Sequence, residues 1–193
     1  MALLGLPWRV APADVVEEDY LVAEPVVAAV SVATAKAHAT RAQPDEVVLA
    51  ADTLVVVDAD VLAKPAGAAA AHEMLERLRG RAHHVLTGVV LRTAVRGWAG
   101  VVDTGVVMRD YQAGEVDAYI ARGEPFDKAG GYAIQDEAFR PVERLEGCYL
   151  NVVGLPLCAV AAGLNALGLS AESAAKPPCA YCDRGAELVR SGS

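Results

Sequence analysis

The sequence has few aromatic residues and fewer basic than acidic side chains, and these shortages exclude several classes of protein. Aromatic residues make up 5% of the 193 positions, so small aliphatic side chains must build the core. Lysine and arginine number 17 against 25 acidic residues, a net charge of -8. This balance argues against a nucleic-acid partner, whose backbone requires a basic surface. No uninterrupted apolar run approaches the ~20 residues of a membrane-spanning helix, so we expect no membrane partner.

Cysteine is also scarce, and its spacing does not resemble a disulfide framework. The four residues are Cys148, Cys158, Cys179 and Cys182. We therefore expect a reducing, cytoplasmic location. Cys179 and Cys182 form a C-x-x-C pair within a small, polar segment, residues 170–193, which we expect to be a flexible tail. Because such a pair is only half of a zinc site, a homodimer clipped by metal is one hypothesis for it.

Two signatures of nucleotide-binding proteins are missing. The sequence contains neither the G-x-x-x-x-G-K-[ST] phosphate loop nor the G-x-G-x-x-G dinucleotide fingerprint, which excludes P-loop NTPases and Rossmann dehydrogenases. What the sequence does contain is alternating apolar strand-like and helical segments over residues 1–169, long enough for one α/β domain. We expect helices at Pro25–Arg41, Ala66–Arg79, Gly114–Arg122 and Pro156–Leu167, and strands at Ala82–Thr93, Trp98–Met108 and Phe139–Leu145.

A stretch near the first third of the chain is typical of a buried strand with an acid at its end. Val47–Ala51 is apolar and stops at Asp52, where open α/β sheets place their sites. Leu54–Val57 and Val61–Ala63 flank an Asp-Ala-Asp step and are predicted to pair as a hairpin, which would bring Lys64 back towards Asp52. On spacing alone, an acid that caps a turn and an exposed lysine remain the simpler interpretation.

A second polar segment lies downstream, in a glycine-containing loop that ends at Gln135. This loop also carries Asp127 and Lys128, and its glycines would let the backbone approach a ligand closely. Together with Asp52 and Lys64, these residues supply the carboxylates and cations that polyphosphate chemistry with a divalent metal needs. His83 and His84 are neighbours on a predicted strand and point to opposite faces, so they do not chelate one ion.

The chain carries an ordered set of short motifs from about Leu3 to Leu167. They are Ala51-Asp52-Thr53; Lys64-Pro65; Leu78-x-Gly80 with His83-x-Val85-x-Thr87-Gly88; Glu124-Pro125-x-Asp127-Lys128-Ala129-Gly130-x-Tyr132-x-Ile134-Gln135; and Gly147-x-Tyr149-x-Asn151-Val152-Val153-Gly154-Leu155-Pro156. Together these motifs resemble the Maf family of nucleoside triphosphate pyrophosphatases, and the helix that ends near Lys36 fits the same pattern.

This resemblance implies a mixed, twisted sheet with flanking helices and two lobes around a deep cleft. It implies an enzyme that hydrolyses nucleoside triphosphates, dTTP or UTP, to the monophosphate and pyrophosphate with Mg²⁺ or Mn²⁺. The implied roles are Asp52 as proton acceptor, Asp52 and Asp127 as metal ligands, Lys36, Lys64 and Lys128 as substrate-binding cations, and Thr53 and Gln135 as residues that select the base.

Elementary chemistry refines two of these roles. An ordinary aspartate has a pKa near ~3.9 and is a weak base at neutral pH, so we expect Asp52 to act first as a metal ligand and second as a base. The amide of Gln135 matches the O4 and N3–H edge of uracil or thymine, but the flipped amide suits cytosine. The Ile134-Gln135 pair resembles the dTTP/UTP subgroup, because the 7-methyl-GTP subgroup carries an acid there.

The chain departs from the family pattern at its start. The family has an S-x-S-P-R-R segment ahead of the residues that match Leu3–Val10, and its arginines would grip the triphosphate. This difference motivates an alternative, a catalytically impaired nucleotide-binding or regulatory protein in cell-division control.

Overall fold

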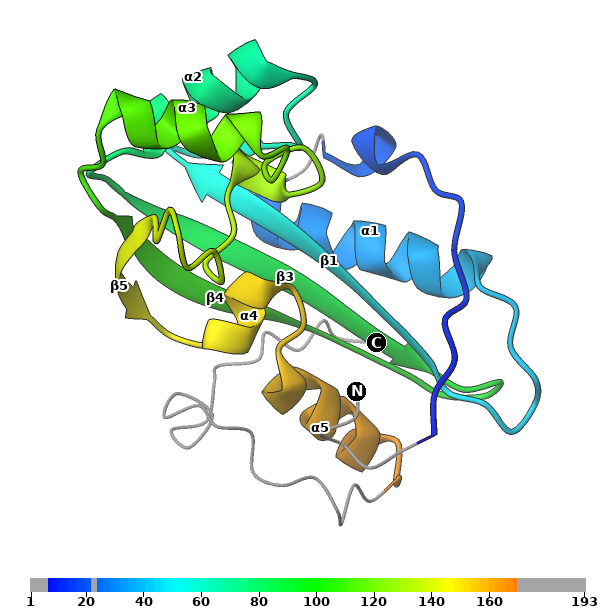
Figure 1. The fold of residues 1–193 in the computed structure, drawn as a ribbon. Helices are drawn as coiled ribbons and strands as arrows, with labels where there is room; N and C mark the ends of the chain where they lie inside the picture. The colour runs from blue at the N-terminus through cyan, green and yellow to red at the C-terminus, as the bar shows by residue number, and fades with distance from the viewer. Residues whose placement is uncertain (1–6, 22–23, 170–193) are drawn as a thin grey trace.

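The computed structural model describes residues 7–21 and 24–169, and its described strands form one antiparallel sheet. The sheet has five strands in the order β2-β1-β3-β4-β5 (Figure 1). The strands are β1 (Val48–Val57), β2 (Asp60–Leu62), β3 (Ala82–Arg92), β4 (Gly97–Met108) and β5 (Val142–Glu146). The expected α/β architecture of a sheet with flanking helices is confirmed. The expected 170–193 tail, with its C-x-x-C pair, lies outside the described residues.

The strand β1 corrects the prediction that Asp52 ends a strand. The two apolar runs around Asp52 form one continuous strand of ten residues, in which Asp52 pairs with Gly88 and Thr53 pairs with Thr87 of β3. An acid is tolerated in mid-strand because its side chain, only 8% exposed, meets the ammonium of Lys36.

The predicted hairpin is confirmed. Val56 of β1 pairs with Val61 of β2, and the two strands are joined at Asp58 and Ala59. Both turn residues have positive φ, 52° and 69°, which matches the backbone twist of a two-residue hairpin turn. Arg81 donates to both carboxylate oxygens of Asp58 at 2.7 Å, which fixes the turn against β3.

Helices cover both faces of the sheet (Figure 1). One face carries α1 (Pro25–Ala39), and the other carries α2 (Ala68–Leu78), α3 (Ala113–Ala121), α4 (Tyr149–Val153) and α5 (Leu157–Ala166). Two short 3₁₀ helices, η2 (Glu17–Tyr20) and η3 (Ala129–Gly131), lie in the connections. No described helix is long and apolar enough to cross a membrane.

Small residues allow α1 to lie very close to the sheet. Ala28 and Ala29 of the helix pack with Leu54 and Leu86 of the strands, and all four are buried. Gly88 lies directly beneath, where an added Cβ would stand 2.3 Å from the carbonyl oxygen of Ala29. Further along the helix, Ala33 and Ala37 pack with Val48 and Val90, so the turn of α1 that carries Lys36 also lies against the sheet.

The opposite face has two separate apolar clusters. The first cluster contains residues of α2 and α3, of the C-terminal half of β1 and of the N-terminal end of β3. The second contains residues of α5, of the C-terminal half of β3 and of the N-terminal half of β4. Phe139 belongs to the first cluster, where its ring stacks on Tyr119 with centroids 4.6 Å apart. That packing explains why β5 begins at Val142 and not at Phe139 as predicted.

Candidate functional site

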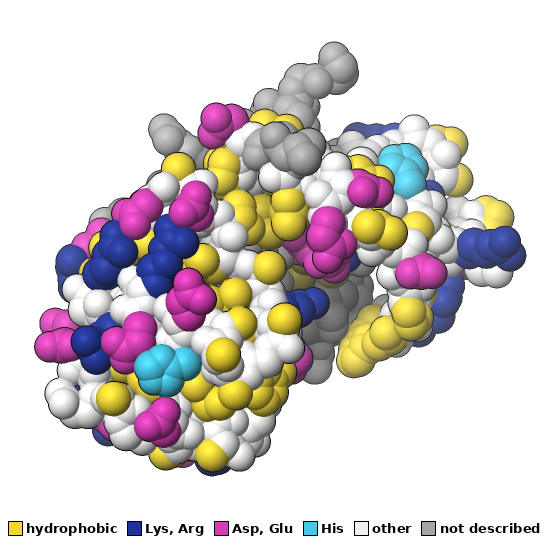
Figure 2. Space-filling model, turned by 90° about the horizontal axis from the view of Figure 1, so that it is seen from above, with side chains coloured by type: hydrophobic (Ala, Val, Ile, Leu, Met, Phe, Trp, Pro, Cys, Tyr) yellow, Lys and Arg dark blue, Asp and Glu magenta, His cyan; other side chains and the backbone are white. Residues whose placement is uncertain are grey.

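A cavity of about 750 Å³ lies beside the part of β1 that β2 does not cover. Six of the residues predicted from the sequence line it: Asp52, Thr53, Lys64, Asp127, Lys128 and Gln135. Because successive side chains of a strand point to opposite faces, Asp52 and Thr53 reach the cavity from the two sides of the sheet. Seen from above, the surface is hollowed between two parts of the molecule (Figure 2), which agrees with the expected cleft.

The face of β1 that α1 covers supplies a group of three charges. The Lys36 ammonium Nζ lies 2.7 Å from Asp52 Oδ1 and 2.6 Å from Glu17 Oε1. Glu17 and Asp52 line the cavity, whereas Lys36 does not line it and contacts both of them. Burial alone would lower the pKa of Lys36, but hydrogen bonds to Asp52 and Glu17 and their charges outweigh it and raise the pKa. The lysine is therefore held as a cation between two carboxylates.

These carboxylates fit a divalent metal only if the substrate completes the site. Asp52 and Glu17 already converge on one positive charge, so their oxygens are placed to share a cation. Among the described residues no three His, Cys, Asp or Glu side chains form a metal-binding group. Mg²⁺ commonly takes one or two carboxylates and completes its shell with phosphate oxygens and water. The donor set therefore matches a metal that arrives with a polyphosphate.

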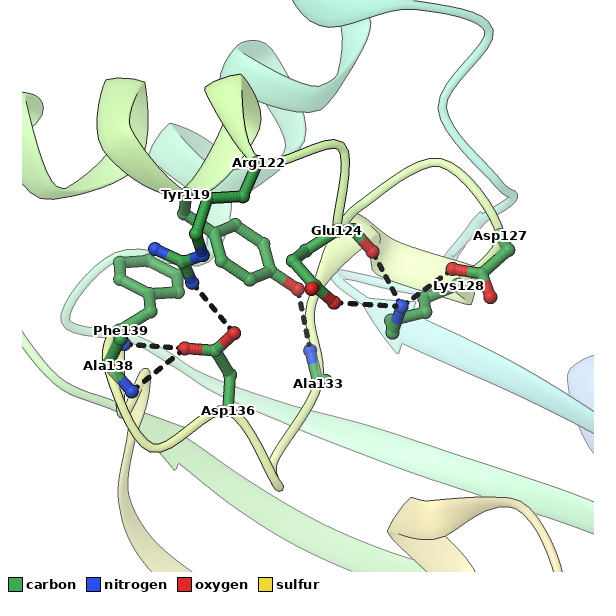
Figure 3. Close-up of polar contacts among 9 residues, drawn as sticks. All are labelled: Tyr119, Arg122, Glu124, Asp127, Lys128, Ala133, Asp136, Ala138 and Phe139. Carbon is green, nitrogen blue, oxygen red and sulfur yellow. Dashed lines mark hydrogen bonds and ion pairs between the residues drawn. The ribbon is translucent and has the colours of Figure 1, made fainter.

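The opposite wall of the cavity carries two lysines with different surroundings. Lys128 donates to the carbonyl oxygen of Glu124 and to Asp127 Oδ1, both at 2.6 Å (Figure 3). These contacts with Lys128 lower the pKa of Asp127, which is 81% exposed in its side chain. Within residues 7–21 and 24–169, the Lys64 ammonium has no hydrogen-bond or ion-pair partner, and its charge also acts on Asp127. Of the two lysines that line the cavity, Lys64 is therefore the one whose ammonium is free to bind a phosphate.

The loop that carries Gln135 is fixed on both sides of that residue. The Ala133 N–H donates to the Tyr119 hydroxyl at 3.1 Å, and Arg122 of α3's C-terminal end donates to Asp136 at 2.7 Å (Figure 3). Burial would raise the pKa of Asp136, but the N–H of Phe139 and the Arg122 guanidinium lower it. Gln135 itself is exposed to the cavity, so a rigid loop presents a side chain that is still able to turn.

Gly130 lets the same loop dock closely on the sheet. Its φ is +69°, and an added Cβ would stand 2.9 Å from Val55 Cγ1. Its N–H donates to the carbonyl oxygen of Ala63, next to Lys64. The hairpin and the loop, which are distant in the sequence, are thus joined into one wall of the cavity.

A hydroxyl network lies under the other side of the cavity, between the two apolar clusters. Thr53 Oγ1 lies 2.9 Å from Thr87 Oγ1, which lies 3.3 Å from the carbonyl oxygen of Asn151. The Asn151 side chain donates to Val85 O and to Thr104 Oγ1, so α4 is tied to β3 and β4. Thr87 and Asn151 were not singled out as site residues by the sequence, because nothing in their spacing shows that they meet Thr53.

The two neighbouring histidines do point to opposite faces, as predicted. His83 is buried and its Nε2 lies 2.7 Å from the Tyr132 hydroxyl, whereas His84 is exposed and pairs with Asp103. Burial, with a smaller effect of the His84 charge, lowers the pKa of His83 to about 4. His83 therefore remains neutral and supports Tyr132, one of the residues that line the cavity.

A cavity with acids and lysines at its walls and a neutral amide at one end is suited to bind a phosphorylated ligand with a polar base. The family described as Maf-like protein matches residues 1–167, and the chain belongs to this family. A dTTP/UTP pyrophosphatase of Thermomicrobium roseum is 48% identical over 160 residues, which cover 81% of this chain and 73% of that protein. A dTTP/UTP pyrophosphatase of Moorella thermoacetica is 45% identical over 163 residues, covering 83% and 84%.

Proposed function

We propose that this chain is a metal-dependent nucleoside triphosphate pyrophosphatase that acts on dTTP and UTP. The observation that carries the proposal is the single cavity in which Asp52, Lys64, Lys128 and Gln135 meet. The two relatives described above are named dTTP/UTP pyrophosphatases, which supports this reaction. The resemblance found in the sequence implies the same class of enzyme. In the reaction, water attacks the anhydride between the α- and β-phosphates, the bridging P–O bond breaks, and monophosphate, pyrophosphate and a proton are released.

The residues of the cavity divide this work by charge. Enzymes catalyse phosphoryl transfer mostly by positioning the reactants and neutralising their charge. In this cavity Lys64 and Lys128 supply the cations, and Asp52 supplies a carboxylate. Asp52 and Glu17 would hold the divalent metal, and Glu18 and Asp127 are two further carboxylates in the cavity wall. Such an ion, when bound, neutralises phosphate oxygens and acidifies the attacking water. Lys36 orients the Asp52 carboxylate by its 2.7 Å contact.

Measurement of both products tests the proposal. With UTP or dTTP and Mg²⁺ or Mn²⁺, we expect pyrophosphate and the matching monophosphate in equal amounts, and Asp52→Asn should lower kcat by about 100-fold or more. The matched control is Asp103→Asn, because Asp103 is an exposed acid that pairs with His84 and does not line the cavity. Release of inorganic phosphate without pyrophosphate, or equal activity of the Asp52 and Asp103 variants, would refute the proposal.

A further inference from the structure

The cavity offers few neutral groups with which to bind a nucleobase. Its described lining contains three neutral polar side chains, those of Thr53, Tyr132 and Gln135. The Tyr132 hydroxyl is already bonded to buried His83, which leaves Thr53 and Gln135 to face a base. The acid Asp52 lies on the opposite face of β1, so the strand separates its carboxylate and the Lys36 ammonium from the side on which the Thr53 hydroxyl lies.

Hydrogen-bond directions decide what Thr53 can offer. A hydroxyl donates one hydrogen bond, and a carbonyl oxygen can only accept. When Thr87 donates to Asn151 O at 3.3 Å, the 2.9 Å contact between hydroxyls requires Thr53 to donate to Thr87. When Thr87 donates to Thr53 instead, the contact with Asn151 O is lost. The first arrangement has one more internal hydrogen bond, which corresponds to about a fivefold to tenfold preference.

The preferred arrangement gives the cavity a fixed polarity. The only hydrogen of the Thr53 hydroxyl points into the protein, towards Thr87, and its lone pairs face the ligand. Thr87 is 0% exposed, so no solvent molecule competes for its hydroxyl. Thr53 therefore accepts a hydrogen bond from a ligand, and it donates one only if either its own hydrogen bond to Thr87 or the bond from Thr87 to Asn151 is broken.

We propose that Thr87 is a positioning residue that fixes the Thr53 hydroxyl as an acceptor, so that the site selects a base with an N–H group. Uracil and thymine carry this group at N3, whereas cytosine has a lone pair there. The Gln135 amide can turn to suit either edge, and Thr53 supplies the polarity that Gln135 lacks. This inference rests on the proposed function, since it assumes a nucleotide in the cavity.

The test compares UTP with CTP in Thr87→Val, which replaces the buried hydroxyl by a methyl group of similar size. We expect the ratio of kcat/KM for UTP to that for CTP to fall about fivefold to tenfold, through KM and not kcat, because the base contact is the same in ground and transition states. Thr87→Ser retains the hydroxyl and should keep the ratio. Thr104→Val is the matched control, because Thr104 is a buried threonine that bonds to Asn151 Nδ2 and has no described hydrogen bond to Thr53.

Two results would overturn the inference: an unchanged ratio in Thr87→Val, or an equal fall in Thr104→Val. A binding measurement separates it from the proposed function. Dissociation constants are measured for the non-hydrolysable α,β-methylene analogues of UTP and CTP, with thermal melting to verify that each variant is folded. If the protein hydrolyses neither nucleotide but binds the uridine analogue more tightly, and only Thr87→Val removes this preference, the proposed function is wrong and the role of Thr87 stands. Equal binding of both analogues by the unaltered protein rejects the role of Thr87.

Discussion

The buried histidine His83 makes the stability of the protein depend on pH in a direction that can be worked out. Burial lowers the pKa of His83 from its ordinary 6.5 to about 4. The unfolded chain therefore binds a proton near pH 6.5 that the folded protein takes up only near pH 4. A proton bound preferentially by the unfolded state destabilises the folded one, so this group removes stability as the pH falls from about 7 to 4.

The two pKa values set the size of the effect. At pH 5 the unfolded imidazole is almost fully protonated and the folded one is about one-tenth protonated, which gives a loss of about 2 kcal/mol relative to pH 7.5. Burial and, to a smaller extent, the His84 charge make charging of the ring unfavourable, and its Nδ1 atom has no hydrogen-bond partner among the described residues. The ring would gain a proton where nothing accepts it.

Urea denaturation of the protein and of His83→Gln at pH 7.5, 6.5, 5.5 and 5.0 measures this effect. Glutamine keeps a neutral hydrogen-bonding group near Tyr132 but does not titrate. We expect the variant to be less stable at pH 7.5, and the gap in unfolding free energy to narrow by about 2 kcal/mol at pH 5. The control His84→Gln replaces the exposed neighbour of His83, and an equally large narrowing in this variant would show that the burial of His83 is not the cause. A gap for His83→Gln that stays constant across the range would refute the reasoning.

Two further predictions concern the packing of α1 and the charge beside the site. Gly88→Ala should lower the free energy of unfolding by about 3 kcal/mol, because its Cβ would stand 2.3 Å from the Ala29 carbonyl oxygen. The control is Gly114→Ala, whose Cβ would meet no atom of the described residues within 4 Å beyond its own helix and chain neighbours, and which should change the free energy of unfolding little in the same urea titration. An equal effect of the two substitutions would contradict the close contact. Lys36→Met should lower kcat for UTP by at least about tenfold, because the Asp52 carboxylate, 8% exposed, loses the cation that it contacts. An unchanged circular dichroism spectrum would show that the variant is folded. A variant with full activity would show that Lys36 only fills space.

Local patterns indicated residues that line the cavity better than they indicated the bounds of the strand that carries Asp52. The hairpin after β1 follows from turn chemistry and alternation, and it places Lys64 at the cavity as expected. Glycines predicted the close approach of the loop that ends at Gln135. The end of a strand at Asp52 was wrong, because an acid in an apolar run looks like a boundary when its partner, Lys36, lies in another element.

The missed residues are those whose role depends on a partner distant in the chain. Glu17 stands in an acidic stretch that is typical of a solvated loop, and only the fold brings it to 2.6 Å from Lys36. Thr87 reads as one more β-branched residue in a buried strand. Its contact with the Asn151 carbonyl joins residues 64 positions apart, and no periodicity reports such a contact. Spacing along one element can be predicted, whereas a hydrogen bond across elements requires the packed structure.

The register of β1 against β3 determines both halves of the cavity at once. Asp52 pairs with Gly88, and the absence of a side chain at Gly88 lets α1 approach until Lys36 meets Asp52. Thr53 pairs with Thr87, whose hydroxyl orients that of Thr53 on the other face. Because side chains alternate along a strand, a slip of one residue would turn the acid away from α1 and the hydroxyl away from its partner together. The charged half and the neutral half of the site are therefore specified by one pairing, and the close fit of Gly88 under α1 opposes any other.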